Sequence, residues 1–447
     1  MMNETKLPIP FIVASMVAGA IQPLIALVDT YFAAQLSTQD LACLALGGGI
    51  ASSVGWIGGQ LIGGFPGVLG RLRGSGDDQA ARQLSGEVVC LAALLGLALA
   101  VPVGLILGEV VMSLTDSEAT GSGARHYLQI RLIGLPFEMA SFVAFGIFRA
   151  GFQAVWTPIL IMSVALIANA LYNFLFVFVF NFGLTGLALG SSIAAFTAVA
   201  AASIPISRWQ GWTPKVGMFN VRHLRLATST KLSVRLGGKA LWRGLFLNMV
   251  LVGSSLVAER FSTSDLAAHG LALQIWLLLA FVIDGFAHAG LAFGSRLIGS
   301  GAFEQARRFG WRLMWHSIML CIILCLELTL IWSFIAPGFN LDGIAAAAFA
   351  TLLFPMVVQT LPASIAFVAD GMLKGAGDLG FLAWQMLIAS VLIFPLSLVV
   401  FGESLRGLWW AVTAWVTTRA VLCVWRLATD RWVVIAKRQM HEVISNP

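Results

Sequence analysis

The stretch LVDTYFAAQLSTQDLA, residues 27–42, joins two long apolar segments and carries the two features that decide the fold. Asp29 stands inside the first segment, which starts near residue 7 and is long enough to cross a bilayer. A carboxylate within a spanning helix is costly, so it indicates a functional site unless a partner helix or the headgroup region neutralises it. The second feature is the hexapeptide STQDLA at 37–42, because a close copy of it occurs later in the chain.

The composition indicates an integral membrane protein. Of the 447 residues, 59% are hydrophobic and 11% are charged, whereas soluble domains carry about 25% charged residues. Long apolar runs with short polar breaks predict spanning helices and not barrel strands, which alternate with a period of two. We predict an all-α protein with twelve transmembrane helices. The expected spans are 9–35, 43–70, 84–112, 126–150, 155–181, 184–207, 234–258, 266–295, 310–335, 343–373, 380–402 and 406–428.

The positions of the basic residues predict the orientation. With twelve spans, all but four of the 27 Lys and Arg residues fall on one side of the membrane. The positive-inside rule makes that side, with both termini, cytoplasmic, and it assigns Asp29 to the outer half of the first span. The net charge of +6 therefore reflects topology. We expect the lipid bilayer as a partner, and no nucleic acid. The four exceptions are Arg125, Arg131, Arg260 and Arg406.

The chain repeats itself at an offset of 225 residues. STQDLA at 37–42 returns as STSDLA at 262–267, and GSG at 74–76 returns at 299–301. One ungapped offset across several spans indicates a duplication, and six spans per half give parallel repeats with substrate bound between them. We predict two pseudo-symmetric six-helix lobes. The expected limits are 1–207 for the N-terminal lobe, 208–233 for a cytoplasmic linker, 234–430 for the C-terminal lobe and 431–447 for a cytoplasmic C-terminal tail.

The duplication also shows which charged residues belong to one half only. Scaffold residues are expected in both halves, whereas ion coupling can be confined to one. Each of three intramembrane aspartates corresponds to an uncharged residue in the other half. The pairs are Asp29 with Ser254, Asp284 with Gly59, and Asp370 with Phe145.

Two pairs of polar residues lie one helical turn apart within spans. Asp284 and His288 share a helix face, and a histidine beside a carboxylate suits a proton relay, although the pair can equally be structural. Asn169 and Asn173 are also four residues apart; their amides either join helices or face a ligand. For Asp370, the simpler interpretation is a local ion pair one turn from Lys374.

Motifs for catalysis and for ATP hydrolysis are missing from the sequence. It contains no phosphate-binding Gly-x-x-x-x-Gly-Lys-Ser/Thr loop, no His-Glu-x-x-His and no Gly-x-Ser-x-Gly. Transport would therefore depend on an ion gradient. The five cysteines lie in or beside apolar spans without a cluster of further ligands, so we interpret them as packing residues. We expect no cofactor other than a coupling ion, and the sequence leaves metal binding open.

Several stretches, taken in order, resemble the multidrug and toxic compound extrusion (MATE) transporters, and more particularly their DinF branch. The resemblance covers nearly the whole chain, and Arg243 in the seventh span fits the same branch. The stretches are VDT at 28–30, RLIGLPF at 131–137, FRAG at 148–151, GLA at 186–188, DGFAHA at 284–289 and ADGMLKG at 369–375.

The resemblance implies a fold of the MATE/MOP-flippase type and antiport of organic, often cationic compounds against protons or sodium. Asp29 occupies the place of the first-span aspartate that couples ions in the family. Proton-coupled relatives often have a second aspartate four residues after the fifth-span asparagine, which corresponds to Asn169. Here that position is Asn173, an amide that cannot titrate. The hydroxyl position of the sixth span corresponds to Ser191.

We therefore predict a monomeric secondary antiporter of the cell inner membrane, and not an enzyme. It would export small organic or amphipathic compounds in exchange for protons or sodium. Asp29 is the expected main coupling residue, with Asp284 and His288 as further ion-coupling candidates. The candidates for the substrate and ion cavity are Asn169, Asn173, Ser191, Arg243 and Asp370.

Two alternatives stay open. A flippase for lipid-linked precursors would have the same fold, but such proteins usually have a strongly cationic cavity, whereas most Arg and Lys here are expected at cytoplasmic ends. A membrane-embedded enzyme would use Asp284 and His288 as acid and base; such an enzyme has no need of an internal duplication.

Overall fold

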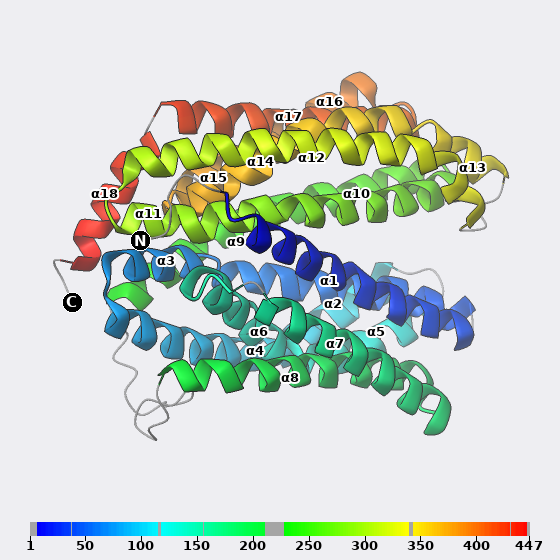
Figure 1. Cartoon of the computed structure of the whole chain (residues 1–447). Helices are drawn as coiled ribbons and strands as arrows, with labels where there is room; N and C mark the ends of the chain where they lie inside the picture. Colours follow the sequence, from blue (N-terminus) through cyan, green and yellow to red (C-terminus); the bar gives the residue numbers. More distant parts are fainter. Residues whose placement is uncertain are drawn as a thin grey trace. The chain divides into compact units, whose positions relative to one another are not determined.

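The computed structural model describes residues 7–36, 38–114, 118–154, 156–210, 228–338, 343–429 and 431–444. Within these ranges the chain is almost entirely helical and contains no β-strand, which confirms the predicted all-α class (Figure 1). Most of the predicted linker between the lobes, residues 211–227, lies outside the described residues.

The helices of the two halves follow one another with short connections. The first half contains α1 (Ile9–Leu36), α2 (Thr38–Leu61), α3 (Phe65–Ser75), α4 (Asp78–Leu114), α5 (Glu118–Leu132), α6 (Leu135–Gly146), η1 (Ile147–Gly151), α7 (Trp156–Phe174), η2 (Leu175–Val179) and α8 (Gly183–Gln210). The second contains α9 (Thr228–Phe261), α10 (Thr263–Ala289), η4 (Gly290–Gly294), α11 (Ser295–Gly299), α12 (Phe303–Gly338), α13 (Gly343–Ala350), α14 (Leu353–Gly375), α15 (Leu379–Leu387), η5 (Ile388–Ile393), α16 (Phe394–Phe401), α17 (Leu405–Ala428) and α18 (Arg431–Ile444). The η segments are π-helical turns.

The starts of the helices repeat the offset found in the sequence. Three helices of the first half have counterparts in the second that begin 225 residues later (263 − 38, 303 − 78 and 343 − 118). The pairs are α2 with α10, α4 with α12, and α5 with α13. The duplication predicted from short sequence matches is therefore a duplication of helices.

The helices account for all twelve predicted spans. Among the described residues, nine helices are long and apolar enough to cross a bilayer, and the number is ten if α5 and α6, which meet at a bend of 52°, count as one span. These ten coincide with predicted spans. The remaining two predictions, 43–70 and 234–258, are occupied by α2 with α3 and by α9.

Contacts divide the chain into two compact units. One contains Lys239–Asn446 and the described part of Met1–Gly19; the other contains Ala20–Gly238. We call them the C-terminal unit and the N-terminal unit. The first part of α1 thus groups with the second half of the chain, and the first part of α9 with the first half. Since the units follow contacts and not the repeat, the lobe limits at 207 and 234 stay a prediction.

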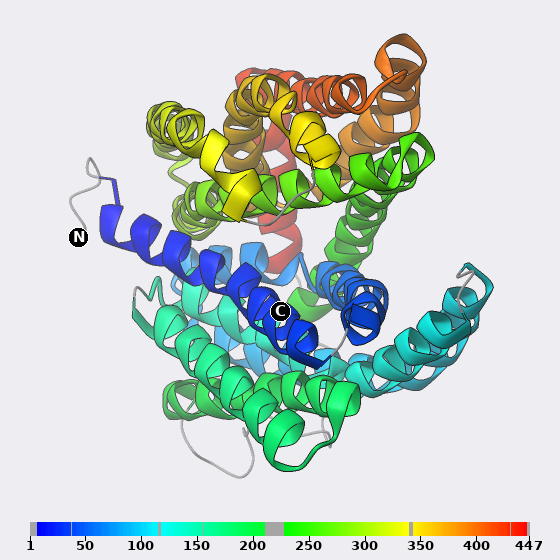
Figure 2. The same cartoon turned by 90° about the vertical axis from the view of Figure 1, so that its right-hand side faces the viewer.

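Small residues let helices approach closely within each unit. In the N-terminal unit, α4 and α5 lie side by side (Figure 2), and Glu109 of α4 forms a 2.9 Å ion pair with Arg125 of α5. In the C-terminal unit, a Cβ atom on Gly285 of α10 would lie 2.5 Å from Cγ of Met16 in α1. The close approach of α10 to α1 excludes a larger side chain at Gly285.

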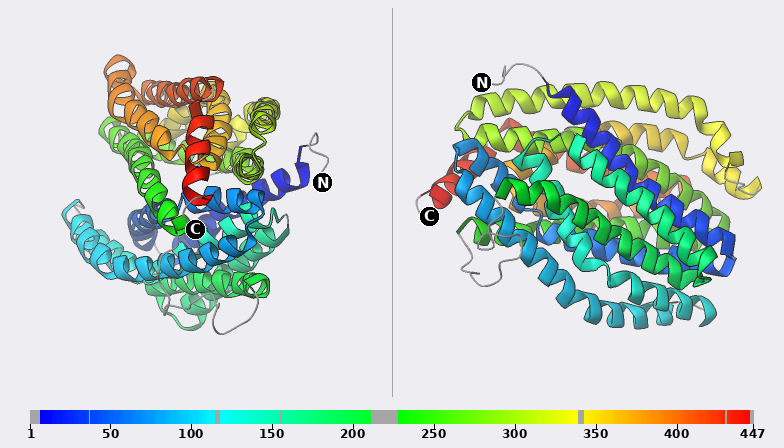
Figure 3. Two further views of the ribbon diagram at one scale, coloured as in Figure 1. Left: turned by 90° about the vertical axis from the view of Figure 1, so that its left-hand side faces the viewer. Right: turned by 60° about the horizontal axis from the view of Figure 1, so that its bottom comes forward.

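The predicted C-terminal tail begins with a helix, α18, which the sequence analysis did not predict. Figure 3 shows α18 in red, turned out of the direction of α17. Trp432 of α18 is buried, and Nε2 of Gln439 donates a 3.0 Å hydrogen bond to the carbonyl of Gly377, in the turn between α14 and α15. Gly377 has a φ of 79°, in the left-handed region that favours glycine. Helix α18 is therefore docked on the C-terminal unit.

Candidate functional site

Asp29 lies in α1, within the part of that helix that belongs to the N-terminal unit. Its carboxylate accepts three hydrogen bonds from two other helices. Oδ1 accepts from Nδ2 of Asn169 at 2.9 Å and from Nδ2 of Asn173 at 2.7 Å. Oδ2 accepts from Oγ of Ser191 at 2.8 Å. Four residues singled out from the sequence thus form one site, which we call the Asp29 site.

Helix geometry explains how α7 reaches Asp29 twice. Asn169 and Asn173 are one turn apart on α7, so both amides extend from the same face. Nδ2 of Asn173 also donates to Oδ1 of Asn169 at 3.3 Å, and Nδ2 of Asn169 donates to Oγ of Ser191 at 3.1 Å. Both asparagines are completely buried. The donors therefore hold one another as well as the carboxylate.

A glycine of α8 makes room for this network. A Cβ atom at Gly190 would lie 2.3 Å from Oδ1 of Asn173. That oxygen is buried and has no hydrogen-bond partner among the described residues, so it presents a free acceptor beside the carboxylate. The phenol of Tyr127, from α5, is also buried and lies close to both Ser191 and Asp29. Gly190 and Tyr127 were not predicted from the sequence.

Asp29 itself has no ion-pair partner among the described residues, because its three donors are neutral groups. The positive charge of Arg131 interacts with Asp29 electrostatically. Arg131 forms its ion pair with another residue, Glu138. Side chains of that pair are 17% and 19% exposed. Arg131 is one of the four exceptions to the charge asymmetry, and its place is explained because Glu138 neutralises its charge.

The other predicted charged residues gather in the C-terminal unit. Asp370 of α14 accepts a hydrogen bond from Arg243 of α9 at Oδ2, and Nη2 of Arg419, from α17, lies 3.6 Å from the same oxygen. All three side chains are buried. Lys374, the partner suggested by the sequence, contributes only an electrostatic interaction. We call this group the Asp370 cluster. Arg419 was assigned to a cytoplasmic end, and its burial in the cluster is unexpected.

Asp284 and His288 form the predicted pair on α10. Nε2 of His288 lies 3.7 Å from Oδ2 of Asp284, which is within reach of an ion pair but too long for a hydrogen bond. Asp284 also interacts electrostatically with Lys374 of α14. The pair therefore adjoins the Asp370 cluster and belongs to the C-terminal unit, not to the Asp29 site.

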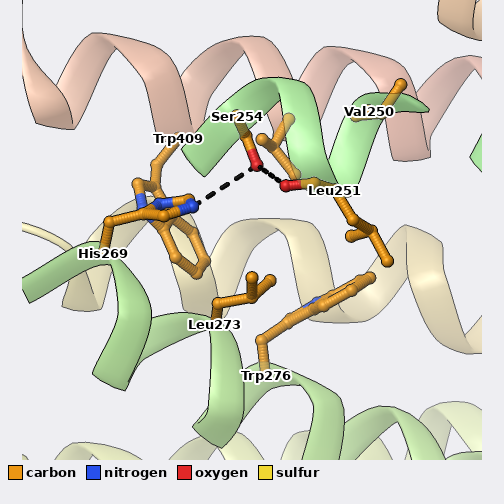
Figure 4. A pocket seen from close by; sticks show the side chains of 8 residues that line it. Val250, Leu251, Ser254, His269, Leu273, Trp276 and Trp409 are labelled. Atoms are coloured by element: carbon orange, nitrogen blue, oxygen red, sulfur yellow. Dashed lines mark hydrogen bonds between the residues drawn. The ribbon is translucent and has the colours of Figure 1, made fainter. Parts of the chain in front are cut away.

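In the second half of the chain, the residue that corresponds to Asp29 is Ser254, and it lines a small cavity. Ser254 of α9 lines it with His269 and Trp276 of α10 and Trp409 of α17 (Figure 4). Oγ of Ser254 donates to the carbonyl of Leu251 at 2.8 Å and lies 3.4 Å from Nε2 of His269. The cavity volume is about 10 Å³, roughly the room that one water molecule needs. None of the described residues that line it is a carboxylate, so the two halves differ here as the offset predicts.

Among the described residues, no group of three His, Cys, Asp or Glu side chains could hold a metal ion. Cys321 and Cys325 have their sulfur atoms 4.0 Å apart, without further ligands around them. The Asp29 site offers a different donor set, one carboxylate with amide and hydroxyl oxygens, which suits a proton or a hard monovalent cation.

A duplicated all-helical fold with apolar spans and a carboxylate of this kind in only one half is typical of membrane transporters. The model of the MatE family matches residues 14–179 and 244–399, one segment in each half. The chain belongs to the MatE family, a family of transporters, so the enzyme alternative is set aside.

Similar proteins agree with the family in sequence and in fold. Protein DETOXIFICATION 42 of Arabidopsis thaliana is 28% identical over 310 residues, which cover 68% of this chain and 58% of that protein. Protein DETOXIFICATION 43 of the same plant is 27% identical over 327 residues, which cover 73% of this chain and 60% of that protein. The matched region thus spans less than two thirds of either relative. A MOP superfamily transporter from Pyrococcus furiosus has the same fold, with a TM-score of 0.86, 16% identity and 96% of both chains covered.

Proposed function

We propose that the protein is a secondary antiporter that exports organic compounds in exchange for protons or sodium, with Asp29 as the main coupling residue. The observation that carries this proposal is a carboxylate held by three neutral donors inside the membrane-spanning N-terminal unit. Because no described cation pairs with Asp29, its charge is available to a proton, a sodium ion or a cationic substrate. The family supplies the transport class, and the names of the relatives refer to detoxification.

Exchange follows if Asp29 binds ion and substrate in alternation. Open to the outside, Asp29 takes up a proton or sodium ion, which removes the attraction for a cationic substrate. Open to the inside, it loses the ion and the site accepts substrate again. In this proposal the protein acts as a monomer of the inner membrane with both termini cytoplasmic. It belongs to the DinF branch of its family, as the motifs indicate.

The test is substrate-driven ion release from proteoliposomes, with proton and sodium gradients imposed separately. We expect Asp29→Asn to abolish coupling while the protein stays folded, since an amide occupies the same volume. Asp77→Asn is the matched control: Asp77 is an exposed residue whose side chain caps α4, and asparagine caps a helix equally well. Undiminished coupling in Asp29→Asn would exclude Asp29 as the coupling residue, and the gradient that drives wild-type transport identifies the ion.

A further inference from the structure

The Asp370 cluster contains more buried positive charge than its carboxylate can neutralise. Arg243 and Arg419 are 5% and 1% exposed, and both point to one oxygen, Oδ2 of Asp370. Lys374 lies nearby and interacts with Asp284 as well as with Asp370. If Lys374 is balanced by Asp284, two guanidinium charges face a single carboxylate. One positive charge is therefore in excess.

Arg419 carries this excess charge. Its Nε, Nη1 and Nη2 atoms are buried and have no hydrogen-bond partner among the described residues. A guanidinium group has five N–H donors, and burying a charge without hydrogen bonds costs several kcal/mol. Oδ1 of Asp370 also has no hydrogen-bond donor within the described part of the chain. Both guanidinium groups therefore meet the same carboxylate oxygen, Oδ2, and neither pairs with both oxygens. A purely structural pair would satisfy these groups.

The surroundings of Arg419 suit an apolar molecule with one charged end. The rings of Trp415 and Phe367 lie 4.9 and 5.9 Å from its Cζ atom. Two contacts fix the register of α15 and η5 along α17, one before Gln385 in the chain and one after it. In this register Gln385 of α15 lies at the same height along α17 as Arg419. Those contacts are Arg426 with Asp378 at 2.7 Å and Trp415 with Ser390 at 3.0 Å. The amide of Gln385 is buried, and neither its nitrogen nor its oxygen has a partner among the described residues.

The fold does not require these charges. At the offset of 225, Arg243 corresponds to Ala18 (243 − 225) and Asp370 to Phe145. The first half is built with apolar residues at both positions. Charges present in one half only, at a desolvation cost, indicate binding more than scaffolding.

We propose that Arg419, with Arg243 and Gln385, binds the carboxylate of an amphipathic organic anion within the C-terminal unit. The planar guanidinium fork matches the two oxygens of a carboxylate, and one negative charge balances the cluster. The aromatic rings beside Arg419 are the apolar surfaces that the body of such a ligand would contact. A phosphate presents the same oxyanion chemistry and could come from a lipid headgroup. The inference goes beyond the proposed coupling at Asp29 and does not depend on it.

Binding to the full-length protein in nanodiscs of zwitterionic lipid tests the site without any ion gradient. The probe is 2-naphthoate, and 2-naphthamide is its uncharged counterpart. We expect wild type to prefer the naphthoate at least tenfold, and Arg419→Gln to lose that preference without losing affinity for the amide. Arg438→Gln, an exposed arginine of α18, should bind like wild type. Because this measurement needs neither an ion gradient nor transport, its outcome is independent of the coupling test.

Arg419→Lys provides a second variant if the glutamine variant does not fold, since it keeps the charge and loses the fork. Its naphthoate affinity should fall several-fold. Equal binding of naphthoate and naphthamide by wild type, or unchanged naphthoate binding by Arg419→Lys and Arg419→Gln, would overturn the proposal. A further result would also overturn it: phosphatidylglycerol added to the nanodisc displaces naphthoate, and the protein retains this lipid only when Arg419 is present. The ligand would then be a lipid phosphate.

Discussion

Nδ2 of Asn173 lies 2.7 Å from Oδ1 of Asp29, although 144 residues separate them in the chain. At the position where the family resemblance leads one to expect a second aspartate, this chain thus has an amide in contact with Asp29. An amide donates to the carboxylate where a carboxyl group would compete with it for a proton or ion. Asp29 is therefore the only carboxylate among the four residues of its site, and the predictions for this site concern how it is held.

Gly190→Ala should disturb the Asp29 site without touching Asp29. The added Cβ would lie 2.3 Å from Oδ1 of Asn173, so the amide must move away and its hydrogen bond to Asp29 is lost. We expect a destabilisation of about 1–3 kcal/mol, typical of overpacking, and a clear loss of ion-coupled transport. Thermal unfolding in detergent and proteoliposome transport measure the two effects.

Gly49→Ala is the control for this variant. Gly49 is in α2, and a Cβ there would meet no atom within 4 Å. Alanine is favoured over glycine inside a helix, so stability and transport should be kept or slightly raised. If Gly190→Ala behaved like Gly49→Ala, the close packing of Gly190 against Asn173 would not matter to the site.

Ser191→Ala should weaken ion coupling more than the variant of the neighbouring serine, Ser192→Ala. Oγ of Ser191 donates to Oδ2 of Asp29 at 2.8 Å, and hydrogen bonds to charged groups contribute about 1.5–3 kcal/mol. We expect the transport rate to fall about tenfold or more. Ser192→Ala is the matched control, because Oγ of Ser192 donates to backbone carbonyls, at 2.9 Å to Ala188 and 3.3 Å to Arg131. Equal rates in the two variants would contradict the role of Ser191.

The residues that meet at the Asp29 site could be singled out from the sequence because they are polar residues in apolar helices. Asp29, Asn169 and Asn173 stand out by their cost in a membrane, and the family pattern added Ser191. Tyr127 and Gly190 gave no such signal: a tyrosine or a glycine in a span is ordinary. Their roles depend on which helix faces lie together, and no pattern within one helix contains that information.

The Asp370 cluster was predicted only in part, for a related reason. The positive-inside rule assigns an arginine near a helix end to the cytoplasmic surface, and Arg419 was interpreted in that way. Its burial depends on the packing of α14 against α17, which brings it to Asp370. Helix α18 was missed because its mixed composition resembles a polar tail, whereas two of its apolar residues, Trp432 and Ala436, are buried in the C-terminal unit.

Gly371→Ala tests the packing of α10 against α14 in the C-terminal unit. A Cβ on Gly371 would lie 2.1 Å from the carbonyl oxygen of Ala287, and backbone cannot rotate away as a side chain can. We expect the helices to separate, with a loss of stability of about 3 kcal/mol or more, at the upper end of overpacking costs. In Gly270→Ala the new Cβ meets nothing within 4 Å, and its melting temperature should stay within a few degrees of wild type.

The ion pair of Arg131 with Glu138 predicts non-additive mutations. The two side chains are mostly buried, and removal of one partner from a buried pair costs about 3–5 kcal/mol because a charge is left alone. Glu138→Gln leaves Arg131 beside the Asp29 site with no partner of its own, so it should lower stability. It should also alter ion coupling, since the freed cation competes for Asp29. Arg131→Met with Glu138→Met removes both charges and should recover most of the stability. A double variant less stable than either single variant would show that the pair is held by packing and not by charge.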